Sequence, residues 1–197
     1  MRLEWSSASR ALPGMAQMGD VTWVREWDGG ARVAVIDGLG HGQEAAAAAD
    51  LAKRCLQDLA GGALEAAFAA LDQALRRSRG AAISMMELDL ENAGLAWAGV
   101  GNVEASLLRA RDLQKARERM LVQSGIVGAR LPRLQVRRLS LEPGDWLLFH
   151  TDGVDSLDAR DLKPLLSPQE NAEHLLAVHA RPSDDALIWL GKVHGNG

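Results

Sequence analysis

The chain has 197 residues, of which 47% are hydrophobic, and its formal net charge is -4 at pH 7. This length favours a single domain spanning 1–197, and the apolar fraction excludes a disordered chain. The acidic balance argues against nucleic-acid binding, and no apolar run approaches the ~20 residues that cross a bilayer. With one cysteine, Cys55, and no apolar signal-peptide core, we expect a cytoplasmic monomer that contacts no membrane.

Strands followed by helices are predicted in the first half of the chain. The strands lie at 3–8, 21–27 and 31–36, and the last has the unbroken apolar character of a strand buried on both faces. Helical spacing of apolar residues predicts a helix over 43–60, ended by Gly61 and Gly62. A second helix follows, with an apolar stripe that runs from Leu64 to Leu75.

Strands separated by turn residues dominate the second half. They are predicted at 81–90, 93–102, 104–110, 134–141, 145–151 and 185–193. One helix interrupts them over 167–180, where Ser167 and Glu170 have the spacing of a capping box and Pro168 suits the first helical position. This order of elements predicts an α+β domain in which the apolar helix stripes cover a sheet.

Aspartates occur at the ends of four predicted strands. Asp20 precedes "VTWV", Asp37 follows "VAVI", Asp152 follows "WLLFHT", and Asp184 and Asp185 precede "ALIWL". A single aspartate of this kind is often only a turn former. Several that converge would repel one another unless cations neutralised them, and their oxygens suit Mg²⁺ or Mn²⁺. The four positions together therefore predict a divalent metal site.

Glycines follow the aspartate in "VIDGLGHG", residues 35–42. Without a side chain at Gly38 the backbone can approach a ligand closely, so the Gly38 carbonyl can face a cation. We therefore expect these glycines to leave space for an ion, its waters and a substrate.

Several motifs occur in a characteristic order. They are "AQMGDVTWV" at 16–24, "VIDGLGHG" at 35–42, "WAGVGNVEASLLR" at 97–109, "FHTDGVDS" at 149–156 and "PSDDALIWLG" at 182–191. In this order and spacing they resemble the metal-dependent PPM/PP2C serine/threonine phosphatases, and most closely the bacterial branch that includes the SpoIIE and Rsb phosphatases. The resemblance covers residues 19 to 191, which is nearly the whole chain.

This resemblance implies a fold and a metal centre. The fold is a four-layer αββα sandwich of two antiparallel sheets flanked by helices, with two divalent ions, Mn²⁺ or Mg²⁺, at one edge. By motif position, Asp37 bridges the ions, the Gly38 carbonyl contacts one of them, Asp152 and Asp184 hold one ion, and Asp20 lies near the other. Asp185 is an alternative to Asp184 as the last ligand. Two such ions lower the pKa of a shared water, which attacks the phosphorus of a phosphoserine or phosphothreonine.

The sequence departs from the larger family at two points. The arginine that usually grips phosphate upstream of the first acidic motif is missing, and only Arg10 lies near that region. Phosphate is therefore expected to be held mainly by the metals. His41 is not placed like the histidine of the eukaryotic members, and two roles stay open for it. It can donate a proton to the leaving oxygen, or it can cap the glycine turn.

The segment between Arg109 and Arg138 contains nine Lys or Arg residues and two Asp or Glu residues. One interpretation is a solvated loop and strand face. The other is a docking surface for an acidic partner, with Arg111, Arg117 and Arg119 as the candidate residues.

The resemblance is greatest to the stand-alone feedback phosphatase of the bacterial stressosome. It implies phosphorylated STAS-domain stressosome scaffold proteins as substrates. Because the first predicted strand begins near Met1, we expect no sensing domain ahead of the phosphatase and a constitutively competent enzyme. Two alternatives stay open: an activator-type phosphatase acting on a phosphorylated anti-anti-sigma factor, and a catalytically inactive domain that binds phosphoproteins.

Overall fold

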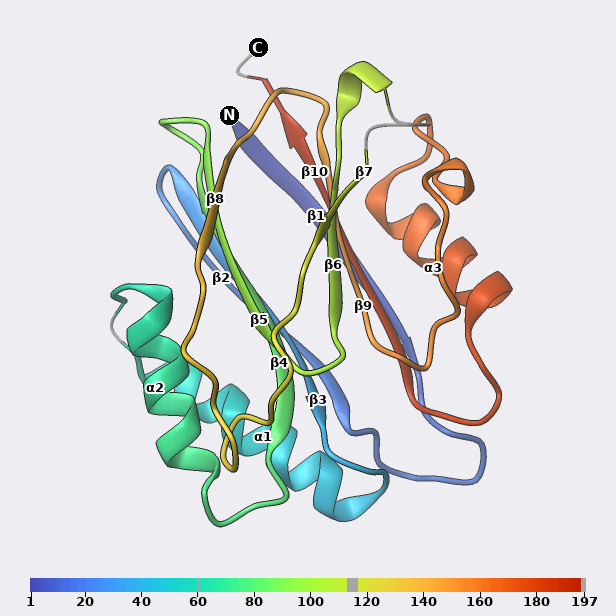
Figure 1. Ribbon diagram of the computed structural model, residues 1–197. Coiled ribbons are helices and arrows are strands. Elements are labelled where there is room, and N and C mark those ends of the chain that lie inside the picture. The colour runs from blue at the N-terminus through green and yellow to red at the C-terminus, as the bar shows by residue number, and fades with distance from the viewer. Residues whose placement is uncertain (60, 113–116, 196–197) are drawn as a thin grey trace.

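The computed structural model describes residues 1–59, 61–112 and 117–195, and it contains two antiparallel sheets of five strands each (Figure 1). From edge to edge, the first sheet contains β1 (Arg2–Arg10), β10 (Ala186–His194), β9 (Trp146–His150), β6 (Glu104–Leu108) and β7 (Arg117–Met120). The second contains β2 (Asp20–Trp27), β3 (Gly30–Gly38), β4 (Ala81–Asp89), β5 (Gly94–Val100) and β8 (Arg137–Ser140). The first and last strands of the chain are therefore neighbours in one sheet.

Helices cover the outer face of each sheet (Figure 1). The helices α1 (Gln43–Asp58) and α2 (Leu64–Leu75) pack on the second sheet, and α3 (Pro168–His179) packs on β1 and β10 of the first. Two short 3₁₀ turns, η1 (Ala110–Asp112) and η2 (Ala159–Asp161), complete the described elements. The four-layer αββα arrangement implied by the family resemblance is confirmed. Among the described residues, no helix combines the length and the apolar character needed to cross a membrane.

The core consists of three apolar layers. One lies between the two sheets and includes the aromatic pair Phe149 and Trp189, whose ring centroids are 5.7 Å apart. A second lies between the second sheet and its two helices, and a third lies under α3. The strand predicted to be buried on both faces, β3, is buried at every position except Asp37. This continuous burial holds the β3 backbone rigidly up to the aspartate.

Local signals predicted the elements well. The capping box at the start of α3 is present, with Ser167 and Glu170 bonded reciprocally and Pro168 in the first turn. The first helix ends at Asp58, two residues before its predicted end. The strand β7 was missed, because "RERM" is a charged edge segment without the alternation of a half-buried strand.

Candidate metal centre

A cavity of about 200 Å³ opens at the end of the sandwich where β3 and β9 finish, which is the lower end in Figure 1. Its described lining residues are Asp20, Asp37, Leu39, Gly40, His41, Asn102, Asp152, Ser183, Asp184 and Asp185. The structure thus brings together all five strand-end aspartates and His41. Gly38 is not among these lining residues.

Strand pairing explains why the carboxylates meet. Asp20 is the first residue of β2 and Asp37 is the penultimate residue of β3, and the antiparallel register places them directly opposite each other. In the other sheet, His150 of β9 pairs with Ile188 of β10. Asp152 leaves β9 at the same end from which Asp184 enters β10, so both sheets deliver carboxylates to one end of the sandwich.

The two aspartates before β10 have different surroundings. Both carboxylate oxygens of Asp185 are engaged, accepting hydrogen bonds from the Leu12 N–H at 2.7 Å and the Gly19 N–H at 2.6 Å. Asp184 is more exposed and accepts only the Asp185 N–H, at 2.9 Å, among the bonds of the described residues. This favours Asp184 as the ligand and gives Asp185 the role of fixing the loop that leads to Asp20.

Burial and mutual repulsion raise the pKa values of the central acids. Burial, followed by the charge of Asp37, raises the pKa of Asp20 from 3.8 to about 8. Burial, followed by the charge of Asp152, raises the pKa of Asp37 from 3.8 to about 7. Burial is also the main cause that raises the pKa of Asp184. Carboxyl groups that resist ionisation in this way favour a divalent cation, which supplies the missing positive charge.

The aspartates that line the cavity suit hard divalent ions, because such ions prefer carboxylate oxygens as ligands. Two of them are held by neutral partners: Thr151 Oγ1 donates to Asp20 Oδ2 at 2.6 Å, and Asn102 Nδ2 donates to Asp152 Oδ2 at 2.6 Å. Within residues 1–59, 61–112 and 117–195, no three His, Cys, Asp or Glu side chains close around a single point. Side chains would therefore have to turn toward an ion as it binds.

The stability of the metal-free protein should fall as the pH rises, and a bound divalent ion should cancel this fall. Because the folded pKa values of Asp20 and Asp37 exceed the unfolded values, the folded state holds these protons more tightly. The metal-free protein should lose stability as the pH rises from about 4 to about 8, by a few kcal/mol in total and roughly 5–10 °C in Tm. Thermal melts with chelator at several pH values measure this loss.

A divalent ion should cancel this loss, because it neutralises the same carboxylates. Melts with Mg²⁺ or Mn²⁺ should therefore show a rise in Tm that grows with pH. The variant Asp20→Asn should show a shallower pH dependence without metal. A metal-free Tm that climbs between about pH 5 and pH 8 would contradict the inferred charge repulsion.

The glycines of both Asp-Gly pairs have a packing role. A Cβ on Gly38 would lie 2.1 Å from the Ala45 carbonyl oxygen of α1, and a Cβ on Gly153 would lie 1.7 Å from the Asp185 carbonyl oxygen. In each case glycine lets two backbones that carry or flank site residues approach closely. Backbone packing therefore requires glycine at both positions, and the predicted contact of the Gly38 carbonyl with a cation stays a prediction.

Asn102 was missed as a site residue. From the sequence, Asn102 was placed only at the end of the predicted strand 93–102 and within the motif at 97–109, but the Asn102 amide contacts Asp152 and also forms a hydrogen bond that lowers the pKa of Asp37. No local signal separates such an asparagine from an ordinary turn residue. Arg10, the one upstream arginine, donates to the Arg181 carbonyl oxygen at 2.6 Å.

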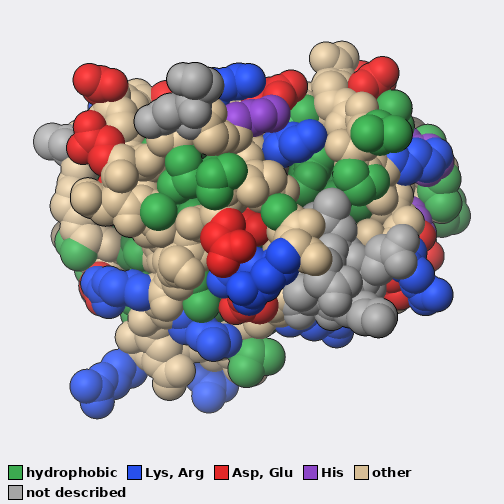
Figure 2. All heavy atoms as spheres, turned by 90° about the horizontal axis from the view of Figure 1, so that it is seen from above, with side chains coloured by type: hydrophobic (Ala, Val, Ile, Leu, Met, Phe, Trp, Pro, Cys, Tyr) green, Lys and Arg blue, Asp and Glu red, His purple; other side chains and the backbone are tan. Residues whose placement is uncertain are grey.

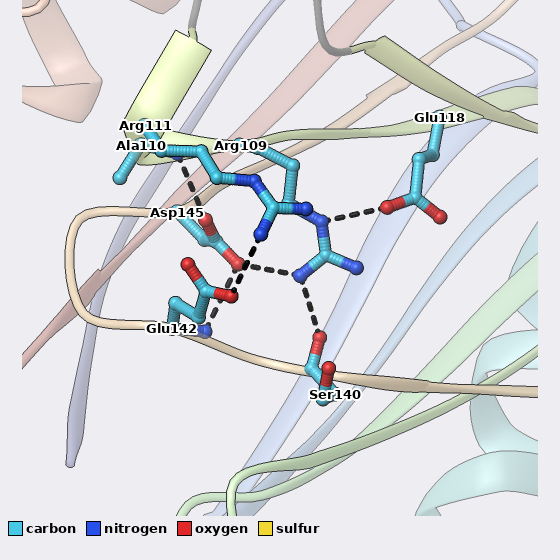
Figure 3. Close-up of polar contacts among 7 residues, drawn as sticks. All are labelled: Arg109, Ala110, Arg111, Glu118, Ser140, Glu142 and Asp145. Carbon is cyan, nitrogen blue, oxygen red and sulfur yellow. Dashed lines mark hydrogen bonds and ion pairs between the residues drawn. The ribbon is translucent and has the colours of Figure 1, made fainter.

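The predicted docking residues lie elsewhere. Arg111 follows the end of β6 that is far from Asn102 and pairs with Glu142 at 3.5 Å, beside the buried Arg109 and Asp145 pair (Figure 3). Figure 2 looks onto this end and shows acidic and basic side chains intermixed. Arg119 is exposed on the edge strand β7, and the side chain of Arg117 lies outside the described residues.

Known proteins are similar to this chain in sequence and in fold. Residues 28–190 match the family of stage II sporulation protein E, SpoIIE. The chain is 26% identical to the phosphoserine phosphatase RsbX of Bacillus subtilis (strain 168) over 181 residues, 91% of this chain and 89% of RsbX.

Two solved structures resemble the whole domain. One comes from work on the bacterial stressosome as a modular system adapted to control secondary messenger signalling. It is 28% identical and has a TM-score of 0.90, and the match covers 98% of this chain and 100% of that chain. The other is RsbX in complex with magnesium, which is 24% identical and has a TM-score of 0.86. The match covers 96% of this chain and 94% of that chain. Because the SpoIIE match spans residues 28–190, which is most of the chain, the chain belongs to the SpoIIE family and is a protein serine/threonine phosphatase of the PP2C type.

Proposed function

We propose that this phosphatase uses two divalent ions, Mg²⁺ or Mn²⁺, to remove phosphate from serine or threonine of STAS-type stressosome scaffold proteins. The observation that carries the proposal is the single cavity onto which five aspartates from both sheets converge. The similarity to RsbX and to a structure from stressosome work supports the choice of substrate.

Each site residue has a proposed role. Asp37 lies opposite Asp20 in the strand register, and its pKa is raised by burial and by the charges of Asp152 and Asp184. It would bridge the ions, with the Gly38 carbonyl, Asp152 and Asp184 on one of them and Asp20 near the other. When bound, such ions activate a water for attack on phosphorus and neutralise charge on the phosphoryl group. The chain itself orients the ligands, through Thr151 on Asp20 and Asn102 on Asp152.

His41 is the proposed proton donor to the leaving serine or threonine oxygen. It is exposed, lines the cavity, and lies close enough to Asp184 for its charge to lower the pKa of that acid. An imidazolium N–H in hydrogen-bond reach of the leaving oxygen is a common general acid in enzymes. No other His or Lys is among the described lining residues of the cavity.

Purified phosphoproteins test the choice of substrate. We expect release of phosphate from a phosphorylated STAS-domain scaffold protein at a kcat/KM at least about tenfold above that for a phosphorylated anti-anti-sigma factor. The two substrates should be compared at equal concentration with the same enzyme and metal. Preference for the anti-anti-sigma factor would assign the chain to the activator type, and binding without release from either would identify a phosphoprotein-binding domain.

A further inference from the structure

A nine-residue segment, 130–138, carries four arginines and no acidic residue, and we call it the basic segment. Its arginines are Arg130, Arg133, Arg137 and Arg138, and all four are exposed. Within the part of the chain that the structure describes, none of them forms an ion pair. By contrast, Arg109 and Arg111 at the other end of the sandwich are both paired with acids.

The basic segment is held on the core by its apolar residues. Leu131, Leu134 and Val136 pack against the cluster between the second sheet and its helices. Its last two residues, Arg137 and Arg138, begin β8 and pair with β5. Because these partly buried apolar side chains hold the backbone on the core, the exposed arginines beside them are presented to solvent from a fixed position. A fixed row of like charges without counter-ions creates a directed positive field.

Hydrogen bonds tie the middle of the basic segment, at Arg133 and Gln135, to the loop that carries Asn102. The Gln123 side chain donates to the Arg133 carbonyl at 2.8 Å and accepts the Gln135 N–H at 2.7 Å. The Gln123 carbonyl accepts the Gly101 N–H at 2.9 Å, and the next residue, Asn102, lines the cavity. In Figure 1 the segment that follows β7 descends to the cavity end and returns upward into β8.

The charge distribution favours an acidic protein as the occupant. The cavity itself is lined by five carboxylates, so it repels a phosphorylated substrate until cations bind. A neighbouring field of opposite sign attracts and orients that substrate over the cavity. We propose that the basic segment docks an acidic surface of the phosphorylated protein substrate, an inference that rests on the proposed function of the metal centre.

Charge reversal tests this docking. The variant Arg130→Glu/Arg133→Glu should lower kcat/KM for a phosphorylated STAS-domain protein by about tenfold or more at low ionic strength. Hydrolysis of p-nitrophenyl phosphate, which makes no surface contacts, should stay unchanged. Added salt should slow the wild-type enzyme on the protein substrate and affect the variant less.

A matched control has the same change in net charge at the other end of the sandwich. Arg2 begins β1 and Arg111 lies in η1, so Arg2→Glu/Arg111→Glu should leave kcat/KM for the protein near the wild-type value. Circular dichroism and Tm verify that both variants are folded. An equal loss in the control would move the docking surface to the η1 end and overturn the proposal.

Two other outcomes separate the underlying claims. If the wild type hydrolyses neither substrate with metal present, the proposed function fails. If it hydrolyses both and Arg130→Glu/Arg133→Glu has no effect, only the docking proposal fails. Hydrolysis of the phosphorylated protein can also be measured with two competitors, a short single-stranded RNA and an unphosphorylated acidic STAS-domain protein. If the RNA inhibits this reaction more strongly, the basic segment binds nucleic acid, and an acidic protein is refuted as its occupant.

Discussion

Asp37→Asn is expected to lower phosphatase activity by about a thousandfold or more, because it removes the carboxylate charge that is proposed to bridge the two ions. A loss of several kcal/mol in transition-state stabilisation corresponds to a factor of this size. The substitution preserves the shape of the side chain, and the residue lies on the rigid strand β3, so the fold should persist. Turnover of p-nitrophenyl phosphate at saturating metal measures the effect.

The stability of the same variant provides an independent check. Without metal, Asp37→Asn should be more stable than wild type above about pH 7, because it relieves repulsion with Asp20 and Asp152. The gain in Tm on adding metal should shrink. Asp50→Asn, on the exposed face of α1, is the matched control and should behave like wild type. Wild-type turnover by Asp37→Asn would show that Asp37 is not the bridging ligand.

Thorough chelation should abolish activity, and Mn²⁺ or Mg²⁺ should restore it. The physical reason is that the cavity contains five carboxylates and one histidine, and no nucleophilic thiol is among its described lining residues. The single cysteine, Cys55, lies in α1 and packs toward the core under the helices. Activity should return with a divalent ion and not with an equal ionic strength of K⁺.

Calorimetric titration of the chelated protein counts the ions, and two binding events are expected. Manganese should support the higher rate. Undiminished turnover after chelation, verified by elemental analysis of the same sample, would contradict a metal mechanism. A single tight ion with full activity would contradict the two-ion arrangement while leaving metal dependence in place.

The folded positions of the five aspartates show why the sequence was informative about this site. Each aspartate adjoins a strand whose apolar pattern is local, and a strand end in a sandwich lies at an end of the molecule. The burial of β3 up to Asp37 and the capping box at Ser167 are likewise properties of a few neighbouring residues. Such features can be predicted because short-range geometry controls them.

Other features depend on residues that are distant in the chain. Asp185 accepts the Gly19 N–H across 166 positions, which separates its role from that of Asp184. Asn102 reaches Asp152 across 50 positions, and Arg111 lies at the opposite end from both.

The sequence by itself determined most of the elements, with β7 as an exception, and the acidic motifs and their order, because these depend on local patterning. Only the tertiary structure decided which of the two aspartates before β10 accepts backbone hydrogen bonds from another segment, which asparagine contacts Asp152, and which arginines are exposed without an acidic partner among the described residues. Those properties depend on strand register and loop packing between segments far apart in the chain, and composition and spacing do not encode them locally.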